Sequence, residues 1–342
     1  MTNQTRILIV EDSPLFAEFF EEIMKDSGLF DVVDVATTGK EATRIAATEC
    51  LDIITMDIHL PDMSGLDAIR NILSNKSTRI VVLTGDPDFA TARRALDALT
   101  LGALDVRAKP TKPKEFSELA TYLKKLTRLP LKRPSSKTKA PLARQRVSRR
   151  SDSLGIVAIA ASAGGPQTLV DLLNQIPKNF PVPIVVAQHM SPEFSHHFCA
   201  WLGDTVPQTV RLGVEGARLE PGTVSVAPAG AHMRVATPNL ITLDSAGPLI
   251  DCHKPSCSAL FDSVAKLYGR NSVGIQLTGM GADGVAGLLA MKQAGAYTIA
   301  QNVESAVVGG MPRRAQEKGA CCAVMVVEEI ANYLRTRGKV RV

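Results

Sequence analysis

The sequence predicts an α/β protein with two doubly wound parallel-sheet domains, flavodoxin-like and then Rossmann-like, joined by a basic linker. Short apolar runs alternate with amphipathic segments in both halves, as buried parallel strands alternate with helices. The chain has 342 residues, more than one ordinary core accommodates. Between the halves lies a stretch rich in Pro, Ser, Lys and Arg without apolar periodicity.

That stretch defines the domain boundaries. Between Pro130 and Ser151 every charged residue is Lys or Arg, whereas the whole chain carries a net charge of only +5. A nucleic-acid-binding domain places its basic excess on a folded face, so this composition predicts a flexible linker and no nucleic-acid partner. We therefore expect one domain over residues 1–128, a linker over 129–152 and a second domain over 153–342.

Five strand signals alternate with amphipathic helices in the first domain. Leu15, Phe19 and Ile23, for example, have the spacing of one helix face. Such alternation predicts a flavodoxin-like sheet whose ligands bind at the carboxyl ends of its strands. The strands are expected over Arg6–Val10, Val32–Ala36, Leu51–Met56, Arg79–Leu83 and Leu104–Val106.

Acidic residues and a lysine lie at these strand ends. Glu11 and Asp12 follow the first strand, Asp57 follows the third, Thr84 ends the fourth and Lys109 follows the fifth. Three carboxylates at one edge repel one another unless a cation lies among them, so Glu11, Asp12 and Asp57 predict a Mg²⁺ site. An aspartate so placed can accept a phosphoryl group as an acyl phosphate, while the metal and Lys109 neutralise the developing charge.

With these residues the first domain resembles a response-regulator receiver over nearly its whole length. The resemblance implies that Asp57 is the phosphoacceptor and that Thr84 provides the switch hydroxyl. It also implies that Lys109 contacts the phosphoryl group and precedes a cis Pro110. Receivers usually have an aromatic residue three places before the lysine, where this chain has Val106.

The second domain begins with the apolar run Ile156–Ala160, which ends just before Ser162. Gly164 and Gly165 permit a sharp turn, and Pro166 suits the first turn of a helix. By itself this turn has three interpretations: a phosphate cradle, a nucleophilic serine, or a serine that merely caps the helix. Partners elsewhere in the chain must decide among them.

Two further apolar runs supply such partners. Ile184–Ala187 leads to His189, and Val273–Leu277 leads through a glycine-rich loop to Asp283. If the three runs are parallel strands of one sheet, Ser162, His189 and Asp283 lie at the same edge. His189 would then take the proton of Ser162 and Asp283 would orient the imidazole, which predicts nucleophilic acyl transfer.

The glycine-rich loop also predicts an oxyanion donor. Met280 lies between Gly279 and Gly281, where its backbone N–H has no bulky neighbour and can face a substrate carbonyl. The side chain of Met280 is expected to pack or to line the rim.

Cysteine spacing and hydropathy exclude other classes of protein. The six cysteines form no C-x-x-C pair or zinc-type spacing, although Cys252, His253 and Cys257 are close in sequence. We expect no cofactor in the second domain. The polar start resembles no signal peptide, and no apolar run reaches about 18 residues, so we expect a cytoplasmic protein without direct membrane insertion.

The order of motifs resembles the CheB family of chemotaxis protein-glutamate methylesterases over nearly the whole chain. After the receiver and linker, the motifs are Ala161–Pro166, Gln188–Met190, Ala227–Pro228, Pro255–Ser256, Leu277–Gly284, Ala300–Gln301 and Gly310–Pro312. The resemblance implies hydrolysis of glutamyl methyl esters, and deamidation of glutamines, on cytoplasmic helices of methylated chemoreceptors. It also implies control by a CheA-type histidine kinase that phosphorylates Asp57.

Two departures from the family pattern concern the second domain. Cys257-Ser258 replaces the usual Val-Asp pair, and Gly309 replaces an aromatic residue. We expect both to affect substrate contacts more than the catalytic residues.

An alternative function is a response regulator whose α/β output domain binds a ligand or partner at the Ser162 turn without catalysis. A DNA-binding output is disfavoured because the second domain has glycine-rich strand–turn–helix units where a compact recognition helix would be expected. A serine-directed fluorophosphonate separates the enzyme from the binding module.

Overall fold

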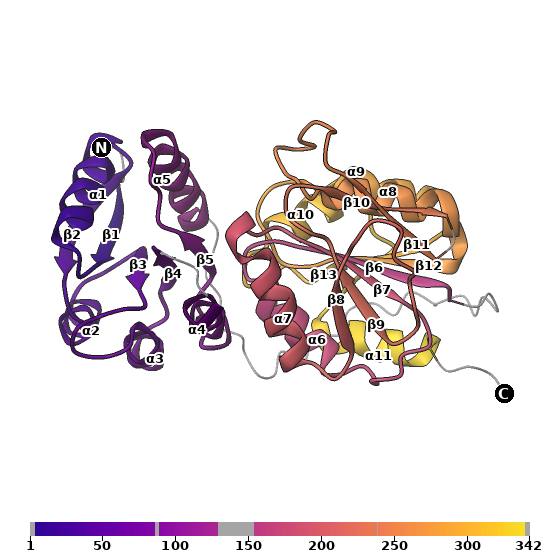
Figure 1. Cartoon of the computed structure of the whole chain (residues 1–342), viewed down its shortest axis with the longest axis horizontal. Coiled ribbons are helices and arrows are strands. Elements are labelled where there is room, and N and C mark those ends of the chain that lie inside the picture. The colour runs from indigo at the N-terminus through magenta and orange to yellow at the C-terminus, as the bar shows by residue number, and fades with distance from the viewer. Residues whose placement is uncertain (1–3, 86–88, 129–153, 238, 339–342) are drawn as a thin grey trace. The chain divides into compact units, whose positions relative to one another are not determined.

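Two parallel sheets organise the chain, one in each of the units Met1–Arg133 and Pro134–Val342 (Figure 1). The computed structural model describes residues 4–85, 89–128, 154–237 and 239–338. The predicted linker, residues 129–152, lies outside the described residues, and so does the start of the second predicted domain at 153. The predicted fold class, two α/β domains with parallel sheets, is confirmed.

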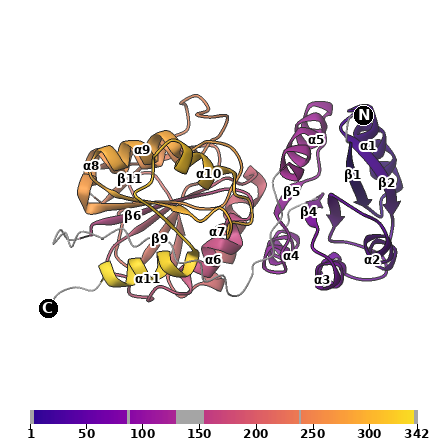
Figure 2. The same cartoon turned by 180° about the vertical axis from the view of Figure 1, so that it is seen from behind.

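The first unit has the strand order β2-β1-β3-β4-β5, with every neighbouring pair parallel. This is the flavodoxin-like order. Helices α1 and α5 cover one face of the sheet, and α2, α3 and α4 cover the other (Figures 1 and 2). The strands are β1 Thr5–Val10, β2 Phe30–Ala36, β3 Ile53–Asp57, β4 Arg79–Thr84 and β5 Asp105–Ala108. The helices are α1 Pro14–Asp26, α2 Gly39–Thr48, α3 Gly65–Asn75, α4 Phe89–Thr100 and α5 Pro113–Thr127.

The second unit has a seven-stranded parallel sheet in the order β14-β13-β12-β6-β7-β9-β8. From β6 the chain first extends the sheet through β7, and later returns to β6 from the other side with β12. Ligands of open α/β sheets bind where the strand order reverses in this way. The strands are β6 Ile156–Ala161, β7 Ile184–Gln188, β8 Thr209–Leu212, β9 Thr223–Val226, β12 Ser272–Gln276, β13 Tyr297–Gln301 and β14 Ala323–Met325.

Helices cover both faces of this sheet, and a separate antiparallel hairpin accompanies it. Helices α8, α9 and α10 lie on one face, and α6, α7 and α11 lie on the other (Figures 1 and 2). The helices are α6 Gly165–Leu173, α7 Ser195–Thr205, α8 Cys257–Tyr268, α9 Val285–Gln293, α10 Gly310–Glu317 and α11 Val327–Arg337. The hairpin strands are β10 His232–Thr237 and β11 Leu240–Asp244, and short 3₁₀ turns span Pro192–Phe194 and Gly269–Asn271.

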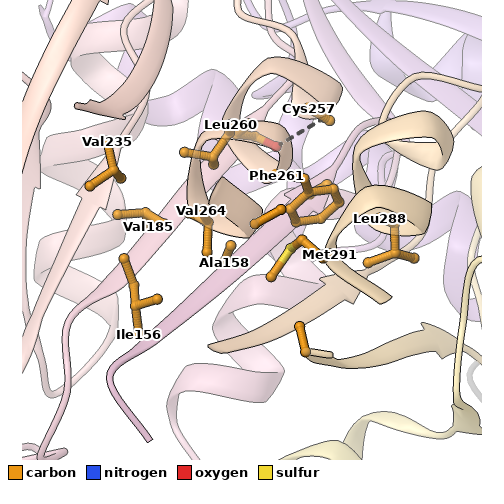
Figure 3. Close-up of a cluster of buried hydrophobic side chains, with 14 of the residues drawn as sticks. Ile156, Ala158, Val185, Val235, Cys257, Leu260, Phe261, Val264, Leu288 and Met291 are labelled. Atoms are coloured by element: carbon orange, nitrogen blue, oxygen red, sulfur yellow. Dashed lines mark hydrogen bonds between the residues drawn. The ribbon is translucent and has the colours of Figure 1, made fainter. Parts of the chain in front are cut away.

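A hydrophobic cluster fixes α8 on the sheet (Figure 3). Leu260, Phe261 and Val264 of α8 are fully buried among β6, β7, β10 and α9 side chains. Full burial of such a side chain stabilises the fold by about 1.5–3 kcal/mol. The cluster therefore holds the first residue of α8, Cys257, in place beside the strand ends.

Within the described ranges, no helix has the length and apolar character needed to cross a membrane.

Candidate active site

Three neighbouring strands bring Ser162, His189 and Asp283 to one edge of the second sheet. Ser162 follows β6, His189 follows β7, and the loop after β12 carries Asp283; these strands are adjacent in the order β12-β6-β7. The loops are joined by backbone hydrogen bonds. Ser162 N–H donates to Thr278 O, and His189 N–H donates to Ala161 O, both at 3.0 Å.

The turn after Ser162 leaves no room for side chains at its glycines. Gly164 has a φ of 72°, in the left-handed region, and a Cβ there would lie 2.7 Å from Val307 Cβ. Gly165 begins α6, and a Cβ on it would lie 2.1 Å from Gln188 Oε1. The Gln188 amide donates to the carbonyls of Ser162 and His189, at 2.9 and 2.8 Å. One buried side chain thus fixes the backbone of both residues.

His189 and Asp283 are in direct contact. His189 Nε2 lies 2.8 Å from Asp283 Oδ2, and both side chains are buried. The other ring nitrogen, Nδ1, is also buried and has no hydrogen-bond partner among the described residues. The structure shows no hydrogen bond between His189 and Ser162 Oγ in the part of the chain it describes. Such catalytic hydrogen bonds often form only when substrate is bound.

The carboxylate of Asp283 is saturated with donors, most of them from the start of α8. Oδ1 accepts from Ser256 Oγ at 2.9 Å, Ser258 N at 3.0 Å and Gly284 N at 2.8 Å; Oδ2 accepts from Cys257 N at 2.7 Å and from His189. Burial raises the pKa of Asp283, but His189 and the N–H groups of Ser258 and Cys257 outweigh it and hold the pKa below its usual range. Asp283 is therefore a carboxylate, suited to orient the imidazole.

Cys257 lies against the same pair. Its Sγ is 3.4 Å from His189 Nε2 and 3.6 Å from Ala187 O. Burial, and then the charge of Asp283, hold the pKa of this thiol well above its ordinary value. The two donations to Asp283 come from the backbone N–H groups of Cys257 and Ser258 and do not depend on which side chains stand there. The expectation that the Cys257-Ser258 departure mainly affects substrate contacts therefore stays a prediction.

Cys257, His189 and Asp283 also have the donor types of a metal site. One ligand atom from each lies within 4.8 Å of the other two. All three are already engaged with one another by contact or hydrogen bond.

Two backbone N–H groups near Ser162, one in the loop after β12 and one in the turn after β6, have no partner among the described residues. A Cβ on Gly279 would lie 2.8 Å from Ser162 Cβ, so this backbone passes directly alongside the serine. Gly279 N–H donates to Val308 O at 2.9 Å, whereas the N–H groups of Met280 and Ala163 make no hydrogen bond within the described residues. The sequence prediction named Met280 alone; Ala163, the residue after the serine, is a second candidate.

The predicted residues of the first unit also come together. Lys109 Nζ lies 2.6 Å from Glu11 Oε2 and 2.5 Å from Asp57 Oδ2, and Thr84 Oγ1 is buried without a partner among the described residues. Glu11, exposed Asp12 and Asp57 are close enough to hold one cation. One lysine leaves these three carboxylates with a net negative charge, which fits a hard divalent ion.

The pKa of Glu11 reflects the excess of negative charge among these carboxylates. Burial raises the pKa of Glu11, Lys109 lowers it in part, and the neighbouring charge of Asp57 raises it again. The resulting pKa lies above the ordinary value.

One expectation for this unit is wrong. The described residues contain one cis peptide bond, Lys254–Pro255, so the bond before Pro110 is trans. Lys109 N–H donates to Thr84 O at 2.8 Å, which extends the β4–β5 pairing up to that bond.

Comparisons with known proteins identify families for both units. Residues 157–334 match the model of the CheB methylesterase family, and residues 7–121 match that of the response regulator receiver domain. A protein-glutamate methylesterase/protein-glutamine glutaminase of Paramagnetospirillum magneticum is 37% identical, over 96% of this chain and 94% of that protein. One of Hahella chejuensis is 38% identical, over 96% and 97%. The crystal structure of the Thermotoga maritima CheB methylesterase catalytic domain has a TM-score of 0.52 and 35% identity, and covers 54% of this chain and 98% of that chain.

Proposed function

The chain belongs to the CheB methylesterase family, and on that premise we propose that its second unit hydrolyses glutamyl methyl esters and deamidates glutamines on chemoreceptors. The observation that carries the proposal is the buried His189–Asp283 pair beside Ser162, at the point where the strand order reverses. A binding module has no need of an imidazole oriented by a saturated carboxylate.

The reaction follows from the positions of these groups. Ser162 Oγ attacks the ester carbonyl as His189 Nδ1, the ring nitrogen not facing Asp283, takes its proton. The negative oxygen of the tetrahedral intermediate accepts from the N–H groups of Met280 and Ala163. His189 then returns the proton to the leaving methoxide, which departs as methanol and leaves an acyl-serine.

Hydrolysis of the acyl-serine uses the same groups. His189 takes a proton from water, the hydroxide adds to the acyl carbon, and Ser162 leaves with the proton that His189 carries. The product is a glutamate side chain. With a glutamine substrate, ammonia leaves in place of methanol and the remaining steps are unchanged.

The first unit supplies the control by phosphorylation. Asp57 accepts a phosphoryl group from a histidine kinase, with Lys109 and the free hydroxyl of Thr84 contacting the transferred group. Glu11, Asp12 and Asp57 would hold Mg²⁺, which when bound neutralises charge and orients the phosphodonor. The substrate of the second unit is then a methylated chemoreceptor, modified on its cytoplasmic helices. The phosphodonor of the first unit is the histidine kinase.

The test is methanol release from a methylated chemoreceptor by the full chain and by Ser162→Ala. We expect the wild type to release methanol and the variant to release none, because the neighbouring Cys257 thiol is buried with a raised pKa and does not replace the Ser162 hydroxyl. Ser305→Ala, an exposed serine of the same unit, is the matched control and should keep full activity. Equal release by wild type and Ser162→Ala would exclude this mechanism, and no release by either would favour a binding module.

A further inference from the structure

A second histidine lies flat against the proposed base. The rings of His189 and His253 are stacked with centroids 3.8 Å apart and planes 13° apart. In the proposed reaction His189 takes up a proton twice, once from Ser162 and once from water, and gives it up after each. What lies against the face of its ring therefore affects how well the transient positive charge is stabilised. His253 is half-buried, between the buried His189 ring and the surface.

The turn that carries His253 has an unfavourable backbone. Asp251 and Cys252 have φ values of 50° and 65°, in the left-handed region that favours glycine. They form a two-residue turn closed by reciprocal backbone hydrogen bonds between Ile250 and His253, at 3.2 and 2.9 Å. Turns of this shape usually contain Asn-Gly. Strain of this kind persists only where the surroundings hold it, and it is frequent at functional sites.

Hydrogen bonds from neighbouring residues hold the segment that contains this turn in place. His232 is fully buried; its Nε2 donates to Pro248 O at 2.8 Å and its Nδ1 accepts from Ser256 N at 3.1 Å. Lys254 Nζ donates to Ser245 O at 2.9 Å on the same loop. Through Ser256, which donates to Asp283, the loop of His253 is connected to the carboxylate that orients His189.

We propose that His253 is a positioning residue for His189. This role rests on the function proposed above. The stacked His253 ring fixes the plane of the His189 imidazole, so that His189 Nε2 stays in contact with Asp283 and His189 Nδ1 faces Ser162. Its flat face also shields the imidazolium from water and stabilises it by stacking. On this proposal the site requires the flat aromatic face of His253. It does not require the ring nitrogens of His253.

His253→Ala and His253→Phe in the full chain separate these requirements. We measure kcat and KM for methanol release from a methylated receptor, and for hydrolysis of p-nitrophenyl acetate, which needs no receptor docking. His253→Ala should lower kcat by about 10- to 100-fold, the cost of misplacing a catalytic group by about 1 Å, with KM within about twofold. His253→Phe, which keeps the stacked face, should restore kcat to within about threefold of wild type.

Each outcome decides the proposal. Wild-type kcat in His253→Ala would overturn it, and so would a His253→Phe variant as slow as His253→Ala, since a ring nitrogen would then be the essential feature. An effect confined to KM would also overturn it, because His253 would then contact substrate instead of orienting His189. His196→Ala, which removes an exposed histidine of α7, should match wild type.

Folding and the underlying function are checked in the same series. Fluorescence of Trp201, the one tryptophan of the chain, buried in the second unit, reports whether each variant is folded. If His253→Ala is unfolded, the His253→Phe result alone decides. A wild-type chain that releases no methanol contradicts the proposed function, whereas an active wild type with equally active His253→Ala contradicts only the role of His253.

Discussion

Glu11 in the first unit and Asp283 in the second are both buried carboxylates at the carboxyl ends of parallel strands, yet their pKa values shift in opposite directions. Glu11 shares one lysine with Asp57, and its pKa is raised by burial and by that second carboxylate. Asp283 accepts from the start of α8 and from His189, and its pKa is lowered. Burial raises both pKa values, so the direction is determined by the donors together with the neighbouring charge, Asp57 beside Glu11 and His189 beside Asp283.

The difference shows what each site still needs. In the proposed mechanism the second site uses only the chain's own residues: the Asp283 carboxylate, the His189 imidazole in contact with it, Ser162, and two backbone N–H groups without a partner among the described residues. The first site has excess negative charge, and the Thr84 hydroxyl beside it has no partner in the part of the chain that the structure describes. We propose that it receives a cation and a phosphoryl group. The experiments below test this contrast.

The largest effect is expected at Asp57. Asp57→Asn should abolish phosphoryl uptake from acetyl phosphate, because an amide cannot form the acyl phosphate. Removal of Mg²⁺ by a chelator should abolish uptake by the wild type as well, since the carboxylates otherwise repel the donor. Intact mass gives the extent of phosphorylation.

Asp67→Asn, an exposed carboxylate of α3, is the matched control for Asp57 and should be phosphorylated normally. Normal uptake by chelator-treated protein would show that the first site is as complete as the second and would remove the metal assignment to Glu11, Asp12 and Asp57.

The next effect concerns the donors around Asp283. Asp283→Asn keeps the shape of the side chain but presents N–H donors to groups that themselves donate, so His189 loses its orientation. The rate of methanol release should fall by about 10²–10⁴-fold. Asp262→Asn, at a half-buried position of α8 that is paired with Lys266, should change the rate little. A loss below about threefold for Asp283→Asn would mean that the carboxylate does not orient the base.

The smallest effect is on acid stability. The folded pKa of Asp283 lies below the value of about 3.9 in an unfolded chain. The stability it contributes is therefore present above that pH and is lost as pH falls toward the folded pKa. Between pH 6 and pH 3 the second unit should lose about 1 kcal/mol from this carboxylate, and Asp283→Asn should lack that loss.

Urea unfolding followed by Trp201 fluorescence measures this quantity for the second unit, because Trp201 is the chain's one tryptophan. Identical pH dependence in wild type and Asp283→Asn would contradict the lowered pKa. Glu11 contributes with the opposite sign, because a raised pKa favours the folded first unit at lower pH.

Local patterns in the sequence were enough to predict the strands of the first sheet and the three central strands of the second, β6, β7 and β12, but not β8, β9, β13 or β14. Buried parallel strands are continuous apolar runs, so β6 Ile156–Ala161 and β7 Ile184–Gln188 could be recognised in the sequence. A residue that follows such a run lies at the carboxyl end of the strand. That rule placed Ser162, His189 and Asp283 together, and Glu11, Asp57 and Lys109 likewise.

Other parts of the site have no such local signal. The hairpin β10–β11, the donors at the start of α8 and the stacking of His253 on His189 depend on contacts between segments distant in sequence. In the sequence alone Cys257 cannot be told from an ordinary small apolar residue. Its position beside His189 follows from the packing of α8 against the sheet. The free N–H of Ala163 could have been expected, because it follows the serine in a strand-to-helix turn.

Reaction of the full chain with a fluorophosphonate in the presence of a chelator tests the central claim most directly. We propose that the second site needs nothing beyond the chain's own residues to activate Ser162. Peptide mass mapping should find one adduct, on Ser162, formed at the same rate with and without chelator and absent from Ser162→Ala. No adduct, an adduct on another residue, or labelling that requires added metal would contradict it.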